Sequence, residues 1–169
     1  MINKTANHPN ETYMRLAIAE ARKGFAQGQY AIGAVVVLRG EVLSVAHTTL
    51  DKERDPTCHA EVNAIRAAVK TMISRGSKAD WSSILKGAWL YSTFESCSMC
   101  TSLAIWANMK GIVYGNTMQE FFKINNMRRD KSHYIFINSK EIAKRGNPRL
   151  TLHEGFLKDE CMELLKLKH

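Results

Sequence analysis

The chain has 169 residues, of which 45% are hydrophobic, 24% are charged and three are prolines. This length suits one domain with a sizeable core, and the composition is that of an ordinary globular protein without repeats or low-complexity tracts. No apolar run is long enough to cross a bilayer, so a membrane partner is not expected. The formal net charge of +8 admits an anionic partner such as a nucleotide or RNA.

The first residues predict a leader, a helix and a hairpin. Residues 1–10 are polar and contain no apolar signal region, so we expect a leader followed by a single domain over 11–169. Residues 12–27 place apolar side chains at helical spacing and predict a packing helix. Residues 29–38 are rich in β-branched side chains, Arg39-Gly40 is a turn signal and 41–46 alternate, which together predict an antiparallel hairpin.

A first chemical motif, Cys58-His59-Ala60-Glu61, lies at the start of a predicted helix over residues 57–74. Asp55-Pro56-Thr57 supplies the residue types that begin helices. Side chains two positions apart point in nearly opposite directions inside a helix, so His59 and Glu61 can share a target only near its start. Imidazole is a zinc ligand, and a free carboxylate beside the metal can accept and deliver protons.

A second motif, Cys97-Ser98-Met99-Cys100, follows a predicted buried strand over residues 88–93 and opens a helix that extends to about residue 109. Cysteines three apart lie on one helix face, and the positive end of a helix favours thiolate over thiol. With His59 they make three ligands, which is the number that a catalytic zinc takes from protein. We therefore predict one zinc ion per chain, facing two helix N-termini.

The cysteines also allow other interpretations. An isolated Cys-x-x-Cys can be a redox pair or half of a structural zinc site. A closed structural site would need Cys58, which would have to turn back on the metal, or Cys161, which fits the core of a C-terminal amphipathic run. The two motifs together favour a hydrolytic site. The remaining cysteines do not suggest a disulfide framework, so the default expectation is a reducing, cytoplasmic setting.

The second half of the chain predicts a parallel crossover and a final helix. Residues 75–86 form a polar connection containing Trp81, which could be core or could cover the pocket. Residues 111–115 predict a buried strand, 118–127 an amphipathic segment, 134–137 a strand or a structured loop, 140–145 a helical turn, 150–153 a strand and 156–167 an amphipathic helix. The whole indicates a five-stranded mixed sheet between helices.

A basic band covers residues 123–149. This segment contains eight basic and two acidic residues, which gives it a formal net charge of +6. Such a band could attract the phosphates of RNA or of a nucleotide, or it could be a solvated basic face. No recognised RNA-binding module accompanies it.

His-x-Glu followed by Cys-x-x-Cys resembles the zinc signature of the cytidine and deoxycytidylate deaminase superfamily. The segments 33–37, 55–57, 59–62, 64–66 and 154–157, with Glu160-Cys161, resemble the branch that holds guanine deaminases and bacterial tRNA adenosine deaminases. The resemblance covers residues 11–167. Two positions depart from it: Ser96 stands where the family usually has proline, and Thr48 stands about where that branch often has an asparagine that contacts the base.

The resemblance implies a three-layer α/β/α fold of the cytidine deaminase type, commonly dimeric. It implies that His59, Cys97 and Cys100 hold zinc, and that Glu61 takes a proton from the bound water and passes it to the ring and the departing amine. Substrate contacts are expected from six positions. They are Thr48 or His47, groups near Ala60 and Glu95, and at most one of Phe121 and Phe122, which could equally pack the core or a dimer interface.

The resulting prediction is a zinc-dependent hydrolytic deaminase of a nucleobase or nucleoside. A small purine such as guanine is the first choice, because no RNA module is recognised. A tRNA-specific adenosine deaminase is the alternative, favoured by the basic band, and a cytosine-type deaminase is third. A zinc-stabilised binding protein without catalysis is the candidate from a different class.

Overall fold

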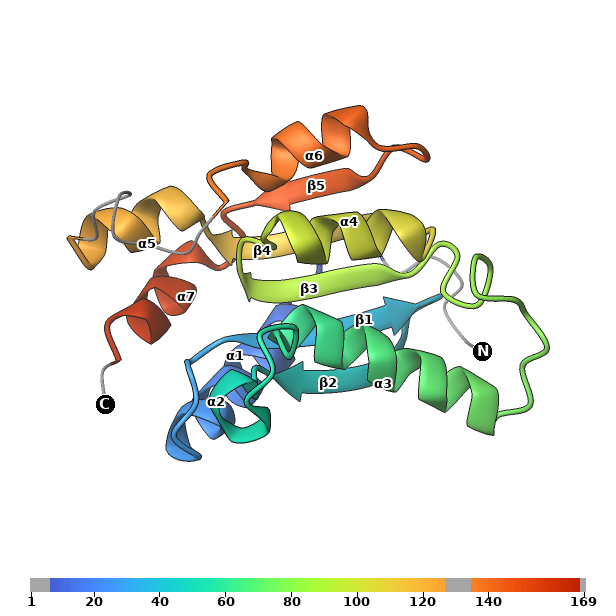
Figure 1. Ribbon diagram of the computed structural model, residues 1–169, viewed down its shortest axis with the longest axis horizontal. Coiled ribbons are helices and arrows are strands. Elements are labelled where there is room, and N and C mark those ends of the chain that lie inside the picture. The colour runs from blue at the N-terminus through green and yellow to red at the C-terminus, as the bar shows by residue number, and fades with distance from the viewer. Residues whose placement is uncertain (1–6, 127–134, 168–169) are drawn as a thin grey trace.

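The computed structural model describes residues 7–126 and 135–167. A five-stranded sheet with strand order β2-β1-β3-β4-β5 lies between layers of helices (Figure 1). The strands are β1 (Gly33–Leu38), β2 (Glu41–His47), β3 (Trp89–Phe94), β4 (Gly111–Asn116) and β5 (Thr151–Glu154). The helices are α1 (Glu11–Ala26), α2 (Leu50–Glu53), α3 (Ala60–Ser74), α4 (Ser98–Trp106), α5 (Met118–Ile124), α6 (Ser139–Arg145) and α7 (Lys158–Leu165).

The strand directions follow from the connections. β1 and β2 form the predicted antiparallel hairpin, and Arg39 and Gly40 between them both have positive φ (53° and 82°), as a two-residue hairpin turn requires. β1 also pairs antiparallel with β3, whereas β3, β4 and β5 are parallel. The predicted crossover from β3 through α4 to β4 is confirmed, and so is the mixed sheet.

Alternating side chains of the strands divide the core into two layers. Val35 and Val37 face one side, where α1 and α7 cover the sheet, and Ala34 and Val36 face the other. The first layer adds Met14, Ala17, Ile18, Ala21, Tyr91, Val113, Cys161 and Leu164. The second adds Ala60, Ala64, Ile65, Leu90, Ala104, Ile112 and Ala143, which come largely from α3, α4, α6 and the strands beneath them. The expected three-layer α/β/α arrangement is therefore confirmed.

Some predicted element boundaries differ from the structure, and residues 135–137 agree with one of two alternatives. β1 begins at Gly33 rather than at residue 29, because Gly28 has a positive φ and the chain turns before the strand. α3 begins at Ala60 rather than at residue 57. Residues 135–137 have no regular structure, in line with the loop alternative, since β5 already occupies the sheet edge beside β4. Tyr134 lies outside the described residues, and α2 was not expected.

One end of the sheet gathers several element termini. The carboxyl ends of the parallel strands β3 and β4 lie on the left in Figure 1, where α3 and α4 begin and where α5 is found. Both α3 and α4 cover the same face of the sheet, as the sequence predicts for two helices that present one site. Over the part of the chain that the structure describes, no helix combines the length and apolarity needed to span a membrane.

Candidate metal centre

His59 and Cys97 occupy equivalent positions at the starts of two helices. His59 is the extended residue before α3 (φ −66°, ψ 154°), and Cys97 is the extended residue before α4 (φ −63°, ψ 175°). The chain reaches His59 through a turn in which the Asp55 carboxylate accepts hydrogen bonds from the backbone N–H and the hydroxyl of Thr57, both at 2.8 Å. Cys100 lies in the first turn of α4. Two separate helix starts therefore bring the ligand atoms together.

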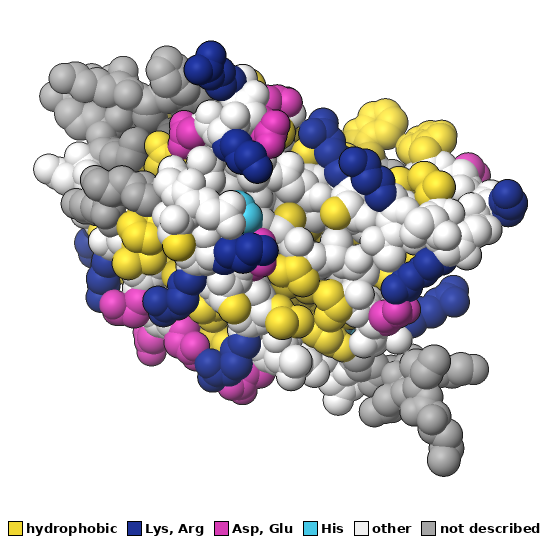
Figure 2. Space-filling model, turned by 90° about the horizontal axis from the view of Figure 1, so that it is seen from below, with side chains coloured by type: hydrophobic (Ala, Val, Ile, Leu, Met, Phe, Trp, Pro, Cys, Tyr) yellow, Lys and Arg dark blue, Asp and Glu magenta, His cyan; other side chains and the backbone are white. Residues whose placement is uncertain are grey.

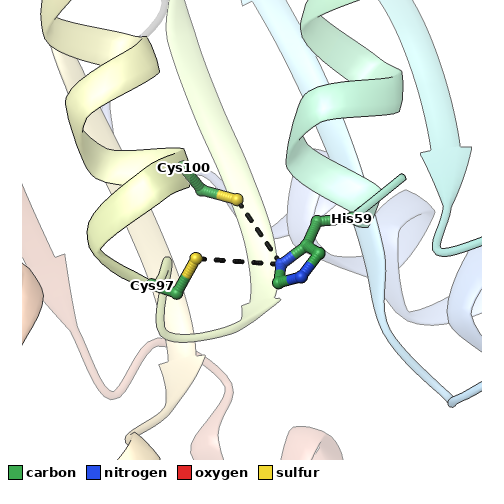
Figure 3. Close-up of side chains that lie close together, drawn as sticks. All are labelled: His59, Cys97 and Cys100. Atoms are coloured by element: carbon green, nitrogen blue, oxygen red, sulfur yellow. Dashed lines mark hydrogen bonds between the residues drawn. The ribbon is translucent and has the colours of Figure 1, made fainter. Parts of the chain in front are cut away.

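The three ligand atoms have the spacing that zinc requires. Nδ1 of His59 lies 3.8 Å from Sγ of Cys97 and 3.6 Å from Sγ of Cys100 (Figure 3). The ligand atoms of this group all lie within 4.8 Å of one another. Tetrahedral zinc with Zn–S of about 2.3 Å and Zn–N of about 2.0 Å places sulfur and nitrogen about 3.5 Å apart. The group therefore fits zinc, which prefers thiolate and imidazole ligands.

The pKa values within the group favour a negative Cys97 beside a positive imidazole. The Cys100 thiol, which donates to Cys97, lowers the pKa of Cys97 to about 4, and His59 contributes in the same direction. The same contact raises the pKa of Cys100. The contact with Cys97 also raises the pKa of His59. Zinc binding must therefore release the proton of the imidazole and that of the Cys100 thiol, because zinc ligands are deprotonated, whereas Cys97 already has thiolate character.

Glu61 lies in the first turn of α3 and is 3% exposed. Burial raises the pKa of this carboxyl, and the charge of Cys97 raises it further, while His59 and Ser96 act in the opposite direction. Ser96 is itself fully buried, and its hydroxyl makes no hydrogen bond of regular geometry within the described residues, although it lies near enough to lower the pKa of Glu61. A buried carboxylic acid beside a metal-binding group is suited to proton transfer near neutral pH.

Asn63 and Thr48 support the backbone before His59, and the role of Asn63 was not predicted from the sequence. The Asn63 side-chain amide lies within hydrogen-bond distance of the carbonyl oxygens of His47 and Cys58 (3.0 and 3.3 Å) and of Oγ1 of Thr49 (3.0 Å). The Thr48 hydroxyl donates to the same Cys58 carbonyl at 3.1 Å. Thr48 is buried, so its hydroxyl supports the loop. The sequence signal that could have identified Asn63 is its position, a polar residue one turn after His59 on the inner face of α3.

The other predicted substrate contacts lie in different surroundings. His47 faces α1, where its Nδ1 lies 2.7 Å from Oε1 of Glu20, so its ring is held apart from the metal-binding group. Ala60 is fully buried at the first position of α3, where helix geometry leaves backbone N–H groups available. The Phe121 ring packs edge-on against Phe94 with centroids 5.5 Å apart.

The side chains of Glu95 and Phe122 contact other residues of the protein. The Glu95 carboxylate accepts hydrogen bonds from the first residues of α5 and α6. The Phe122 ring packs against Phe136, with centroids 5.0 Å apart. A role of these side chains in substrate binding stays a prediction.

The predicted basic band lies partly outside the described residues, which exclude Arg128, Arg129 and Lys131. Within the described part, Lys140 pairs with Glu154 and Arg145 pairs with Glu141. Part of the positive charge is therefore compensated locally.

Comparison with known families agrees with this geometry. A family model for the cytidine and deoxycytidylate deaminase zinc-binding region matches residues 7–116, a span that contains His59, Glu61, Cys97 and Cys100. The chain belongs to this family. The match accounts for the donor set, and zinc is the cofactor that His59, Cys97 and Cys100 could hold.

The chain is similar to relatives that are named for two different substrates. The tRNA-specific adenosine deaminase of Aquifex aeolicus is 31% identical over 104 residues, which are 62% of this chain and 64% of that protein. The guanine deaminase of Bacillus subtilis is 34% identical over 109 residues, 64% of each chain. The chain thus spans less than two thirds of the length of these relatives.

A solved structure from a study of A-to-I editing by tRNA:A34 deaminases superposes with a TM-score of 0.66 at 25% identity, covering 92% of this chain and 99% of that one. The likeness therefore extends over nearly all of the fold, including the C-terminal elements beyond residue 116.

Proposed function

We propose that the protein is a zinc-dependent hydrolase that removes the exocyclic amino group of a purine. The observation that carries the proposal is the cluster of one imidazole nitrogen and two sulfurs within 4.8 Å of one another, with a buried carboxylate two residues after the histidine. Three protein ligands leave a fourth position for water, as in catalytic zinc sites.

The residues then have distinct roles. Zinc, when bound, supplies a Lewis acid that lowers the pKa of water to about 7. Glu61 accepts the proton of the attacking water and delivers protons to the ring nitrogen and to the departing amine. One water is consumed, the C–N bond to the amino group breaks, a C–O bond forms and ammonia leaves. The raised pKa of Glu61 suits a group that must both accept and donate a proton.

Two substrates, adenosine in tRNA and guanine, are supported equally well. Relatives named for tRNA adenosine and for guanine match at 31% and 34% identity, so the sequence-based preference for guanine receives no added support. The net charge of +8 favours RNA. On the face shown in Figure 2, however, basic side chains are scattered and several adjoin acidic ones, rather than forming one continuous track. Both substrates therefore belong in one experiment.

The test is ammonia release by the zinc-loaded protein from a substrate panel. The panel holds a tRNA anticodon stem-loop with adenosine at the wobble position, guanine, adenine, adenosine, cytosine and cytidine. The proposal expects release from the stem-loop or from guanine, and none from the Glu61→Gln variant. Release from cytosine or cytidine alone would move the protein to the third candidate. Release from none, with zinc bound, would favour a non-catalytic zinc-stabilised protein.

The resemblance also leads us to propose a homodimer. Sedimentation equilibrium of the zinc-loaded protein measures this directly, and a single species at the 19.1 kDa mass of one chain would contradict it.

A further inference from the structure

Glu95 is a buried acidic side chain, 4% exposed, in the turn between β3 and α4. Its Oε2 accepts a hydrogen bond from the backbone N–H of Met118 at 2.9 Å. Its Oε1 accepts from the backbone N–H and the hydroxyl of Ser139, at 2.8 and 2.9 Å. Met118 and Ser139 are the first residues of α5 and α6, whose N–H groups have no partner inside their own helices. One carboxylate therefore joins the starts of two helices.

The backbone around Glu95 is fixed on its other sides. The N–H of Glu95 donates to the carbonyl oxygen of Asn116 at 2.7 Å, which continues the pairing of β3 with β4. The carbonyl oxygen of Ser96 accepts from Oγ1 of Thr101 at 2.9 Å, inside α4. Cys97 follows directly. The loop that presents Cys97 is thus the same loop that holds α5 and α6.

The segments that Glu95 joins carry a row of aromatic rings. Phe94 packs edge-on against Phe121, Phe121 against Phe122, and Phe122 lies tilted on Phe136, with ring centroids 5.5, 6.0 and 5.0 Å apart. Phe94 immediately precedes Glu95, and Phe121 and Phe122 lie on α5. In Figure 1, α5 lies at the end of the sheet where α3 and α4 begin. The row therefore lies at the same end of the molecule as the metal-binding group.

A carboxylate is required for this arrangement because its two oxygens face two helices at once. An amide in the same place would present one oxygen and one NH2 group, so only one of the two helix starts could keep its acceptor. The NH2 group would then face an N–H donor, and a buried donor without an acceptor is unfavourable.

We infer that Glu95 is a positioning residue of the proposed deaminase: it locks α5, α6 and their phenylalanine row against the loop that carries Cys97, and so sets the substrate-facing wall without touching the substrate. This inference rests on the proposed function, because the wall matters only where a base is bound. It assigns Glu95 a role within the protein in place of the direct substrate contact expected from the sequence.

The first test needs no substrate. Hydrogen exchange of the zinc-loaded protein is compared for wild type, Glu95→Gln, Ser139→Ala and a control, Glu41→Gln. Glu41 is an exposed residue at the start of β2, and its carboxylate pairs with Arg75 at the end of α3. Amides of α5 and α6 are expected to exchange about tenfold faster in Glu95→Gln, and less so in Ser139→Ala, which loses one donor. Zinc content is expected to be unchanged. Equal exchange in wild type and Glu95→Gln would overturn the inference.

The second test separates positioning from general damage. Misplacement by about 1 Å can cost about 100-fold in rate, so we expect kcat/KM of Glu95→Gln to fall about 10- to 100-fold, with a rise in KM as part of the loss because the substrate-facing wall is displaced. A purely structural role would reduce the active fraction, lowering kcat with KM unchanged, and that outcome would overturn the inference. If Glu95→Gln does not fold, Ser139→Ala carries both tests, with an expected rise of about threefold in KM. If wild type releases no ammonia from any substrate, the proposed function fails, and the exchange result still decides whether Glu95 holds α5 and α6 in place.

Discussion

At the scale of single residues, Glu61 is the group on which the proposed chemistry depends. Glutamine has nearly the same shape but cannot accept a proton, and general acid–base catalysis is worth about 10²- to 10⁴-fold. We expect Glu61→Gln to lower kcat by about that factor while it binds zinc like wild type. Ammonia release and metal analysis measure the two effects, with Glu163→Gln on the exposed face of α7 as the control. Turnover near wild-type level would remove Glu61 from this role.

The buried carboxyl of Glu61 also predicts a pH dependence of stability in the zinc-free protein. Its pKa is raised above the ordinary value of 4.5, first by burial and then by the charge of Cys97. Between the ordinary pKa and this raised pKa, the folded state binds more protons than the unfolded state. The free energy of unfolding therefore falls as pH rises over that range. Glutamine does not titrate.

The zinc-free Glu61→Gln variant should therefore gain stability relative to wild type as pH rises above 4.5, the ordinary pKa of this carboxyl. Urea denaturation at a series of pH values measures the difference. A difference that is constant over this range would contradict the raised pKa.

The cysteines should respond differently to metal removal. The thiolate of Cys97, with its pKa lowered to about 4, is expected to react first with iodoacetamide once zinc is chelated. Cys161 is fully buried, and burial raises its pKa to about 12, so it should react only on unfolding. Mass spectrometry of labelled peptides reads both sites. Equal labelling of Cys97 with and without zinc would argue that it is not a ligand.

At the scale of elements, the contact of β1 with α1 depends on one glycine. A Cβ on Gly33 would lie 2.1 Å from the carbonyl oxygen of Ala17 and 2.6 Å from the backbone nitrogen of Ala21. Backbone atoms cannot move aside as a side chain can, so we expect Gly33→Ala to lower the free energy of unfolding by about 3 kcal/mol.

The matched control for this substitution is Gly76→Ala. Its Cβ would meet nothing, but its φ of +82° is unfavourable, so a cost of about 1 kcal/mol is expected. Urea denaturation compares the two variants. A loss at Gly33 no larger than at Gly76 would show that α1 can move away from the sheet.

At the scale of the whole molecule, the charge distribution distinguishes the two substrate candidates. Lys144 and Arg149 are exposed members of the basic band. If RNA binds there, replacing both by glutamate should weaken stem-loop binding and reduce the slope of log K against log[salt] by about 1.4 to 1.8, since each of the two phosphate contacts contributes about 0.7 to 0.9. Deamination of free guanine should not change.

The control for this charge reversal is the double variant Lys78→Glu and Lys86→Glu, which makes the same change in the connection between α3 and β3. Fluorescence anisotropy over a range of salt concentrations gives both slopes. Equal weakening by the two double variants would indicate attraction to net charge rather than a defined RNA surface.

The sequence by itself determined the hairpin, the parallel crossover and the mixed sheet between helices, because these depend on local spacing, and the ligand set, because it depends on the chemistry of His59, Cys97 and Cys100. The three-layer fold was implied by the family resemblance. Only the tertiary structure decided the surroundings of the other site residues. In the folded chain His47 contacts Glu20, and Asn63 supports the backbone before His59. Glu95 lies between Met118 and Ser139. The contacts of His47 and Glu95 join residues 23 to 44 positions apart, and a periodic pattern reports only which face of an element is buried, not which distant group meets it there.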